Sequence, residues 1–212
     1  NSHQEAAGIR QELKASGLEL ETMTEDIFDT IWENRPSLPK TPVFILDETR
    51  TGASCTEKIG RIQEAIEKNG ASAIILSALD EIAWTLNLRG NDVHCNPVFI
   101  SYLLISKEGY TLYILEDKIT DEVRQYLNLH HVEIKSYSAL AEDLRTFKEN
   151  HQGILQISPL ANEALYDLSA QYADTIVQAS PVALMKAVKN ETDQAGFLKA
   201  MERDGVALVK FL

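Results

Sequence analysis

Cysteine is scarce in this 212-residue chain, which has only Cys55 and Cys95, far apart and outside any CxxC pair. This excludes a disulfide framework and argues against a structural zinc site, because both need several spaced cysteines. Two unpaired thiols suit a reducing compartment, and we therefore expect the cytoplasm. Long apolar runs are also missing. No stretch approaches the roughly 20 residues that cross a bilayer, so we expect no membrane partner.

Positive charge is in short supply. The chain has 20 Lys and Arg residues against 32 Asp and Glu residues, a formal net charge of −12, and no dense basic run. Because an acidic surface repels phosphate backbones, this composition excludes broad nucleic-acid binding. Hydrophobic residues make up 44% and charged residues 25% of the chain. That is ordinary for a globular domain and excludes disorder along the whole chain.

Familiar catalytic signatures are absent from the sequence. It has no HExxH or HxH pattern, no GxSxG, no Walker A motif and no GxGxxG. We therefore assign no catalytic, cofactor-binding or metal-ligating residue within the chain. Two carboxylates leave one alternative open. Asp47 after an apolar segment and Asp80 at a helix start could hold magnesium in a nuclease-like sheet, although helix-opening acids more often cap the helix.

The middle of the chain alternates strand patterns with helix patterns. Apolar runs at 73–76 and 153–157 predict buried strands, and the runs on both sides of Gly109 predict an antiparallel hairpin. A proline-rich connector at 35–42 marks a boundary before this region. We therefore expect an α/β domain with a mixed β-sheet flanked by helices, over roughly residues 40–182.

Besides a helix over 5–20, which Gly17 would end, two further helices are expected outside that region. The first covers 24–33 with Thr24 as its N-cap, and the second covers 190–212 with Asn190 as its N-cap. Phe197 and Met201 recur at helical spacing in the second helix, with no evident partner in the chain. We therefore expect the chain to be a fragment of a longer protein.

Polar residues concentrate between 87 and 97 (NLRGNDVHCNP), after a helix and before an apolar strand. Arg89 can pair with a carboxylate, and Asn91 and Asp92 favour tight turns. Such a loop either bonds to itself or faces a ligand, and the residues alone leave these two interpretations evenly balanced. Arg89, Asn91 and Asp92 are our candidate site, a loop that faces a cleft.

The same loop carries a family resemblance. Residues 78–92 (ALDEIAWTLNLRGND) and 96–99 (NPVF) closely resemble the middle domain of the three-domain Xaa-Pro aminopeptidases, which are creatinase/prolidase-like metallopeptidases. Three further stretches agree with that family: 31–36 (IWENRP), 180–191 (SPVALMKAVKNE) and 203–208 (RDGVAL). The resemblance covers essentially the whole chain.

The resemblance implies a layout and a cofactor. Residues 1–36 would be the tail of a first domain with its linker, 37–182 a middle domain of ribonuclease-H-like (creatinase/prolidase N-terminal-type) fold, and 183–212 the first helix of a catalytic domain. In this family the catalytic domain holds two metal ions, usually manganese, through Asp, His and Glu ligands. No position of this chain matches those ligands, so the resemblance implies that the metal site lies outside it.

The implied function is the non-catalytic middle portion of an enzyme that removes the N-terminal residue from peptides with proline in second position. This portion would shape or restrict the substrate cleft and would be inactive alone. Its partners would be the peptide and its own catalytic domain. The alternative function has no enzymatic role: the chain would be a stand-alone interaction module that forms a homodimer through the exposed end helix.

Overall fold

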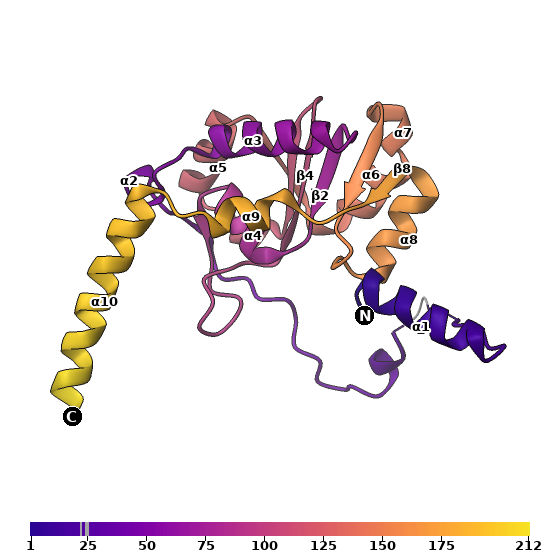
Figure 1. The fold of residues 1–212 in the computed structure, drawn as a ribbon, viewed down its shortest axis with the longest axis horizontal. Helices are drawn as coiled ribbons and strands as arrows, with labels where there is room; N and C mark the ends of the chain where they lie inside the picture. The colour runs from indigo at the N-terminus through magenta and orange to yellow at the C-terminus, as the bar shows by residue number, and fades with distance from the viewer. Residues whose placement is uncertain (22, 24–25) are drawn as a thin grey trace.

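The described part of the chain, residues 1–21, 23 and 26–212 of a computed structural model, contains one six-stranded sheet (Figure 1). The strand order is β6-β5-β4-β2-β7-β8. These strands are β2 (Ala73–Leu76), β4 (Ser101–Ser106), β5 (Tyr110–Ile114), β6 (Val132–Ser136), β7 (Ile154–Ile157) and β8 (Asp174–Val177). The β2/β4 and β4/β5 pairs are antiparallel and the other three pairs are parallel, which confirms the predicted mixed sheet and hairpin.

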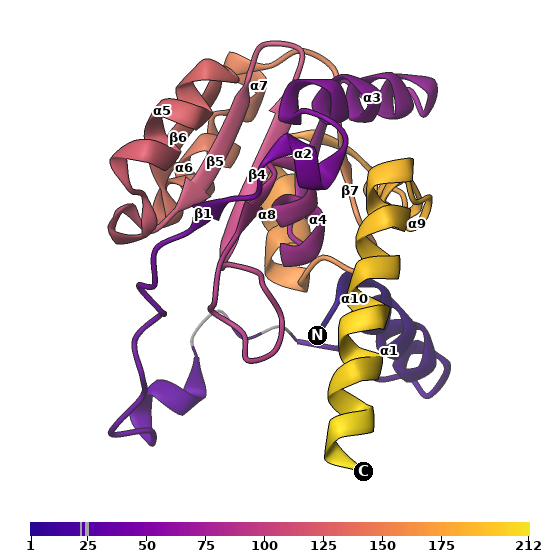
Figure 2. The ribbon, with the colours of Figure 1, turned by 90° about the vertical axis from the view of Figure 1, so that its left-hand side faces the viewer.

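Helices cover both faces of the sheet (Figure 2). One face carries α3 (Cys55–Lys68), α4 (Leu79–Thr85), α5 (Asp121–Leu129) and α9 (Pro181–Ala187). The other face carries α6 (Leu140–Arg145), α7 (Phe147–Asn150) and α8 (Glu163–Tyr172). The predicted α/β class, a mixed sheet flanked by helices, is therefore confirmed.

The central strand β2 shows why the sheet needs helices on both sides. Successive side chains of a strand point to opposite faces. Ile74 and Leu76 belong to the core under α3 and α4, whereas Ala73 and Ile75 belong to the core under α6 and α8. All four residues are buried, so a continuous apolar run is required in place of an alternating one.

Several short elements connect these layers. They are β1 (Phe44–Ile45), α2 (Glu48–Thr51), β3 (Leu88–Arg89), η2 (Glu116–Lys118) and η3 (Tyr137–Ala139). β1 pairs with β3 in a separate two-stranded antiparallel ladder. This small ladder lies at the base of the polar loop and positions its first residues.

The segments before and after the α/β body project from it (Figure 1). The first contains α1 (His3–Ala15) and the 3₁₀ helix η1 (Ile27–Thr30), which Asp26 caps. The helix expected over 24–33 is therefore shorter than predicted, and its expected cap Thr24 lies outside the described residues. Asn190 does cap α10 (Glu191–Phe211): its side chain accepts the Asp193 N–H, and its own N–H donates to the Asp193 carboxylate. In α10, all of which the structure describes, no residue is buried.

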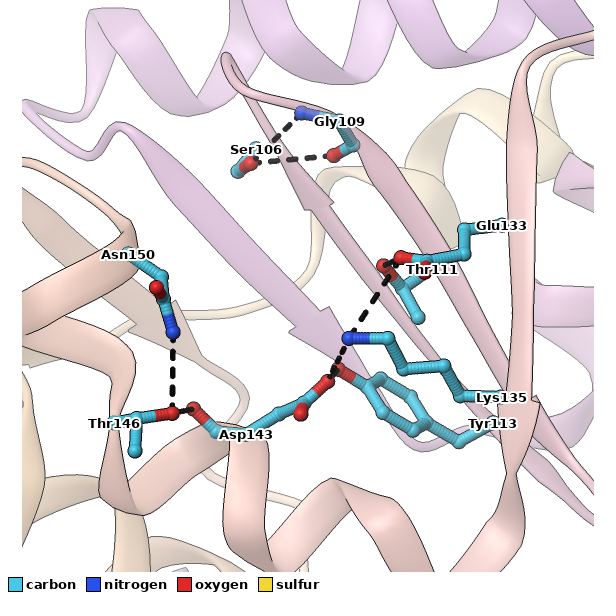
Figure 3. Close-up of polar contacts among 9 residues, drawn as sticks. All are labelled: Ser106, Gly109, Thr111, Tyr113, Glu133, Lys135, Asp143, Thr146 and Asn150. Carbon is cyan, nitrogen blue, oxygen red and sulfur yellow. Dashed lines mark hydrogen bonds and ion pairs between the residues drawn. The ribbon is translucent and has the colours of Figure 1, made fainter.

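A polar cluster fastens α6 to the edge of the sheet (Figure 3). The buried Tyr113 hydroxyl donates to Asp143 Oδ2 at 2.7 Å, and Lys135 Nζ donates to the same oxygen at 2.7 Å. Burial raises the pKa of Tyr113, and Asp143 raises it further. The phenol therefore stays protonated and acts as a hydrogen-bond donor, so the cluster serves packing between α6 and β5.

Candidate functional site

The polar loop joins β3 to β4, and Gly90 lets the start of the loop pack closely against Val98 and Phe99, just before β4. A methyl group at Gly90 would lie 2.7 Å from the Cβ of Phe99 and 3.1 Å from the Val98 carbonyl oxygen. The Asp92 N–H donates to that Val98 carbonyl at 3.2 Å. Close approach of two backbones, which glycine alone permits, therefore shapes the base of the loop.

Asp92 points inward from this loop. Its carboxylate forms an ion pair with Lys118 of η2, and both side chains are 0% exposed. Asp92 Oδ2 also accepts the Ile100 N–H at 2.7 Å. The backbone of Lys118 in turn accepts the Val43 N–H at 3.0 Å. The Asp92 carboxylate is thus engaged in holding the loop against the body of the domain.

Arg89 is half-buried at the start of the loop. Its Nη1 donates to the carbonyls of Ala83 and Leu88, both at 2.8 Å. Among the described residues it forms no ion pair with a carboxylate, so the pairing expected from the sequence is replaced by bonds to backbone oxygens. Burial lowers the pKa of Arg89, and the nearby Asp193 carboxylate opposes this. The Arg89 guanidinium group therefore stays positively charged, and among the described residues no carboxylate pairs with it directly.

The tip of the loop is exposed to solvent. Asn91 lies there with His94 and Cys95, and the side chains of all three are exposed. Cys95 has a φ of 60°, a left-handed conformation that is uncommon for a residue with a Cβ. The structure therefore places the three candidate residues in three different environments, with Asn91 facing solvent, Arg89 half-buried and Asp92 directed into the domain.

A pocket of about 250 Å³ connects the loop with the beginning of α10. Arg89 and Pro97 line it from the loop side, and Asp193 and Phe197 line it from α10. Lys186 of α9 lines it as well and is ion-paired with Asp80 of α4. The fold thereby brings the candidate loop next to the helix that leaves the domain.

Sequence reasoning missed a buried lysine behind this pocket. Lys58 of α3 is 2% exposed. Its Nζ donates to the Trp84 carbonyl at 3.0 Å and to the Asn87 side chain, and it lies 4.4 Å from the Trp84 ring centroid. Burial, followed by the charge of Arg89, lowers the pKa of Lys58 to about 8. Asn87, with a φ of 53°, donates onward to the Ala53 carbonyl at 2.9 Å.

A signal for Lys58 was present in the sequence. Lys58 falls between Cys55 and Ile62 on the apolar stripe of α3. A lysine on such a stripe either extends its charge to the surface or finds acceptors inside. Here the positive φ of Asn87 directs an amide oxygen toward the ammonium group, which fixes the connection from α4 to β3.

Asp47 and Asp80, the two carboxylates of the nuclease alternative, each bind a different partner within the chain. Asp47 accepts the Thr49 N–H at 2.8 Å and caps α2, and Asp80 pairs with Lys186. Within the described residues, no group of three or more His, Cys, Asp or Glu side chains is placed to hold a metal ion. None of the described helices is long and apolar enough to cross a membrane.

Comparison with known proteins identifies the class of domain. Residues 34–193 match the model of the creatinase/prolidase N-terminal domain. The chain therefore belongs to the creatinase/prolidase N-terminal domain family, as its motifs predicted.

Individual relatives narrow the similarity to Xaa-Pro aminopeptidases. A probable Xaa-Pro aminopeptidase P of Sordaria macrospora is 38% identical over 209 residues, which are 93% of this chain and 34% of that protein. Xaa-Pro aminopeptidase 1 of Dictyostelium discoideum is 39% identical over 180 residues, covering 85% of this chain and 28% of that protein. The chain thus spans about a third of the length of these relatives.

A solved structure matches the entire chain. It is an X-prolyl aminopeptidase from Caenorhabditis elegans, described as a cytosolic enzyme with a di-nuclear active site. The TM-score is 0.92 at 25% identity, and the match covers 100% of this chain and 35% of that one. The fold described above, including the projecting α10, is therefore that of a segment of this enzyme.

Proposed function

We propose that this chain is the non-catalytic middle portion of a metal-dependent aminopeptidase that removes the first residue from peptides with proline in second position. The observation that carries the proposal is the match of the whole chain with about a third of the X-prolyl aminopeptidase structure. The curated relatives in two other organisms bear the same kind of name. The substrate would be a peptide with a free amino end, and the chain's main partner would be its own catalytic domain.

The proposed metal site lies in the two thirds of the relatives that this chain does not span. The neighbour is described as having a di-nuclear active site, and the described residues of this chain include no group suited to a metal ion. Two divalent ions, which we propose to be manganese, would activate a water molecule and polarise the scissile carbonyl. This chain's own residues would orient and confine the peptide.

The proposed layout has three parts. Residues 1–36 would be the end of a first domain with its linker, 37–182 a middle domain, and 183–212 the first helix of the catalytic domain. The change from α9, which packs on the sheet, to α10, in which no described residue is buried, supports assigning α10 to the catalytic domain. The proline-rich stretch after the short helix η1 supports the first boundary.

Within this layout, the loop with Arg89, Asn91 and Asp92 would face the substrate cleft and limit access to it. The support is positional, since Arg89 shares a pocket with Asp193 and Phe197 at the start of α10. Asp92 would act through loop shape, because its carboxylate binds Lys118. Arg89 and Asn91 would contact the peptide or the catalytic domain.

We also propose a cytoplasmic location. The solved neighbour is described as cytosolic. This chain has two cysteines, of which Cys55 is buried and Cys95 is exposed, and both are free. An exposed free thiol is typical of reducing compartments.

The test compares this chain with the full-length enzyme in hydrolysis of an Xaa-Pro peptide, with manganese added. We expect the full-length enzyme to cleave and this chain to be inert, both with and without the metal. Cleavage by this chain alone would overturn the proposal, because the catalytic groups would then lie within these residues. Failure of the full-length enzyme to cleave Xaa-Pro bonds would overturn the proposed substrate.

One observation favours a second candidate function, a stand-alone interaction or dimerisation module. Phe197, Met201 and Leu208 of α10 are 56%, 68% and 59% exposed. Such a stripe requires a cover, either the rest of the enzyme or a second copy. Light scattering over a concentration series separates the two: the interaction module predicts a defined dimer of this chain that Met201→Lys abolishes, together with no peptidase activity in the full-length protein.

A further inference from the structure

The carboxyl ends of three parallel strands meet at one edge of the sheet. β2 leads into α4, which packs on one face, whereas β7 leads into α8, which packs on the opposite face (Figure 1). Where the helices after two adjacent parallel strands diverge in this way, a crevice opens between the strand ends. Such crevices are the usual place for ligands in open α/β sheets. This position has no part in the function proposed above.

A pocket of about 110 Å³ occupies this crevice. Oxygen-bearing side chains line it, namely Ser77, Glu81, Ser158 and Ser180, together with apolar parts of Ile75, Leu76, Ala78 and Leu160. Among the described residues, no lysine, arginine or histidine lines it. Because an ordered water needs only about 10–15 Å³ of such space, the pocket has room for a small ion with a few waters.

Glu81 is the one charged group in the pocket wall. It is 8% exposed, and among the described residues its carboxylate has no ion pair. The adjacent Asp80 takes the ammonium group of Lys186 instead. Burial raises the pKa of Glu81, and the charge of Asp80 adds to the rise, while Ser180 and Lys186 oppose it. Lys186 compensates this carboxylate only in part, because its ammonium group is paired with Asp80. A buried carboxylate is stabilised by a cation beside it.

The serine hydroxyl oxygens in the pocket can still bind a cation. Ser158 Oγ accepts the Leu160 N–H at 3.2 Å, and Ser180 Oγ accepts the Val182 N–H at 3.2 Å. Each hydroxyl oxygen has a second lone pair. The Ser77 hydroxyl forms no hydrogen bond with another described residue, so it is free to turn toward an occupant.

We propose that this pocket binds a monovalent cation of potassium or ammonium size, held by the Glu81 carboxylate and the hydroxyls of Ser77, Ser158 and Ser180. One carboxylate balances one positive charge. Calcium takes about six to eight oxygen ligands, commonly with several carboxylates, and the described residues contain no cluster of three or more His, Cys, Asp or Glu. The cation would join the ends of β2 and β7 to the segment before α9, which Ser180 caps.

The test is thermal unfolding of this chain in potassium, ammonium or choline chloride at constant ionic strength. We expect a saturable rise in Tm of about 2–4 °C with potassium or ammonium relative to choline, because a ligand that binds only the folded state stabilises it. Glu81→Gln should abolish the difference between salts. Glu64→Gln, a change on the exposed surface of α3, should retain it. Methylammonium and rubidium distinguish an ammonium site from an alkali-ion site.

Equal Tm values in all three salts would overturn the proposal, as would an unchanged salt difference in Glu81→Gln. If Glu81→Gln does not fold, Ser77→Ala replaces it and is expected to reduce the salt difference without unfolding the protein. Crystals grown in rubidium chloride give an independent answer, since anomalous density in the pocket would support the proposal and its absence would overturn it. None of these measurements depends on peptidase activity.

Discussion

Asp92 and Lys118 form an ion pair in which neither side chain is exposed to solvent. The two residues are 26 positions apart in the sequence, so their contact ties the polar loop to the turn after β5. A buried pair of this kind contributes little beyond an apolar pair of equal size, but losing one partner leaves an uncompensated charge. The shape of the candidate loop therefore depends on both residues together.

Replacing one partner of this pair should be strongly destabilising. Lys118→Met leaves the Asp92 carboxylate buried and unpaired, and we expect a loss of about 3–5 kcal/mol in the free energy of unfolding, measured with urea. The double variant with Asp92→Leu should recover most of the loss. Lys40→Met breaks an exposed pair with Asp117 and should change stability little. A single Lys118→Met variant as stable as the wild type would show that the pair does not anchor the loop.

Gly90→Ala should disturb the base of the loop. The added Cβ would lie 2.7 Å from the Phe99 Cβ, and forcing this buried segment before β4 to shift costs about 1–3 kcal/mol. Chemical denaturation measures the change. The matched control is Gly109→Ala, since nothing lies within 4 Å of a Cβ at Gly109. Equal stabilities of the two variants would mean that the loop adjusts freely.

Lys58 should make stability depend on pH above neutrality. Its pKa is about 8 in the folded protein against an ordinary value of 10.5. Between these values the unfolded chain binds more protons at this site than the folded protein, so the Lys58 contribution to stability increases as the pH rises from about 8 to about 10.5. The full difference corresponds to about 3 kcal/mol.

The measurement is the free energy of unfolding of the wild type minus that of Lys58→Met, taken between pH 7 and pH 10. Subtraction removes the titration of groups that do not interact with Lys58, such as Tyr126, whose pKa burial raises. We expect the difference to grow in favour of the wild type as the pH rises. A flat difference would indicate that Lys58 keeps its ordinary pKa in the folded state.

The two cysteines should differ in reactivity. Burial raises the pKa of Cys55 to about 12, whereas Cys95 is exposed in the loop. Since the thiolate is the reactive form, a disulfide reagent should modify one thiol of the native protein rapidly and the other only as fast as the protein opens. Cys95→Ser should remove the rapid phase. Rapid modification of two thiols in the wild type would contradict the packing around α3.

Arg89 and Asn91 should affect catalysis in the full-length enzyme. If the loop faces the cleft, Arg89→Ala and Asn91→Ala should each lower kcat/KM for an Xaa-Pro peptide by about tenfold, which corresponds to about 1.4 kcal/mol of transition-state stabilisation. Asn128→Ala on α5, also exposed, serves as the control. Unchanged kcat/KM and unchanged stability in both loop variants would remove the loop from the proposed function.

Local patterns were enough to predict the class of fold. The apolar run of β2 and the two runs around Gly109 identify strands, because strand and helix periodicities are properties of neighbouring residues. Asn190 as an N-cap could be recognised for the same reason, since its partner Asp193 lies in the next turn. The polar loop and its family motifs were also visible as contiguous residues. The expected helix over 24–33 was predicted too long, because among its described residues, 26–33, only four form a 3₁₀ helix, and none of those four is buried.

Only the tertiary structure decided what the loop residues contact. The sequence marks Arg89, Asn91 and Asp92 as one polar group, but the fold points Asp92 at Lys118, leaves Asn91 in solvent and directs Arg89 to backbone carbonyls. Burial of Lys58 against Asn87, and of Glu81 beside the hydroxyls of Ser158 and Ser180, likewise depends on segments distant in sequence. A charge is stabilised by whatever lies within a few ångströms of it, and long-range packing alone sets those neighbours.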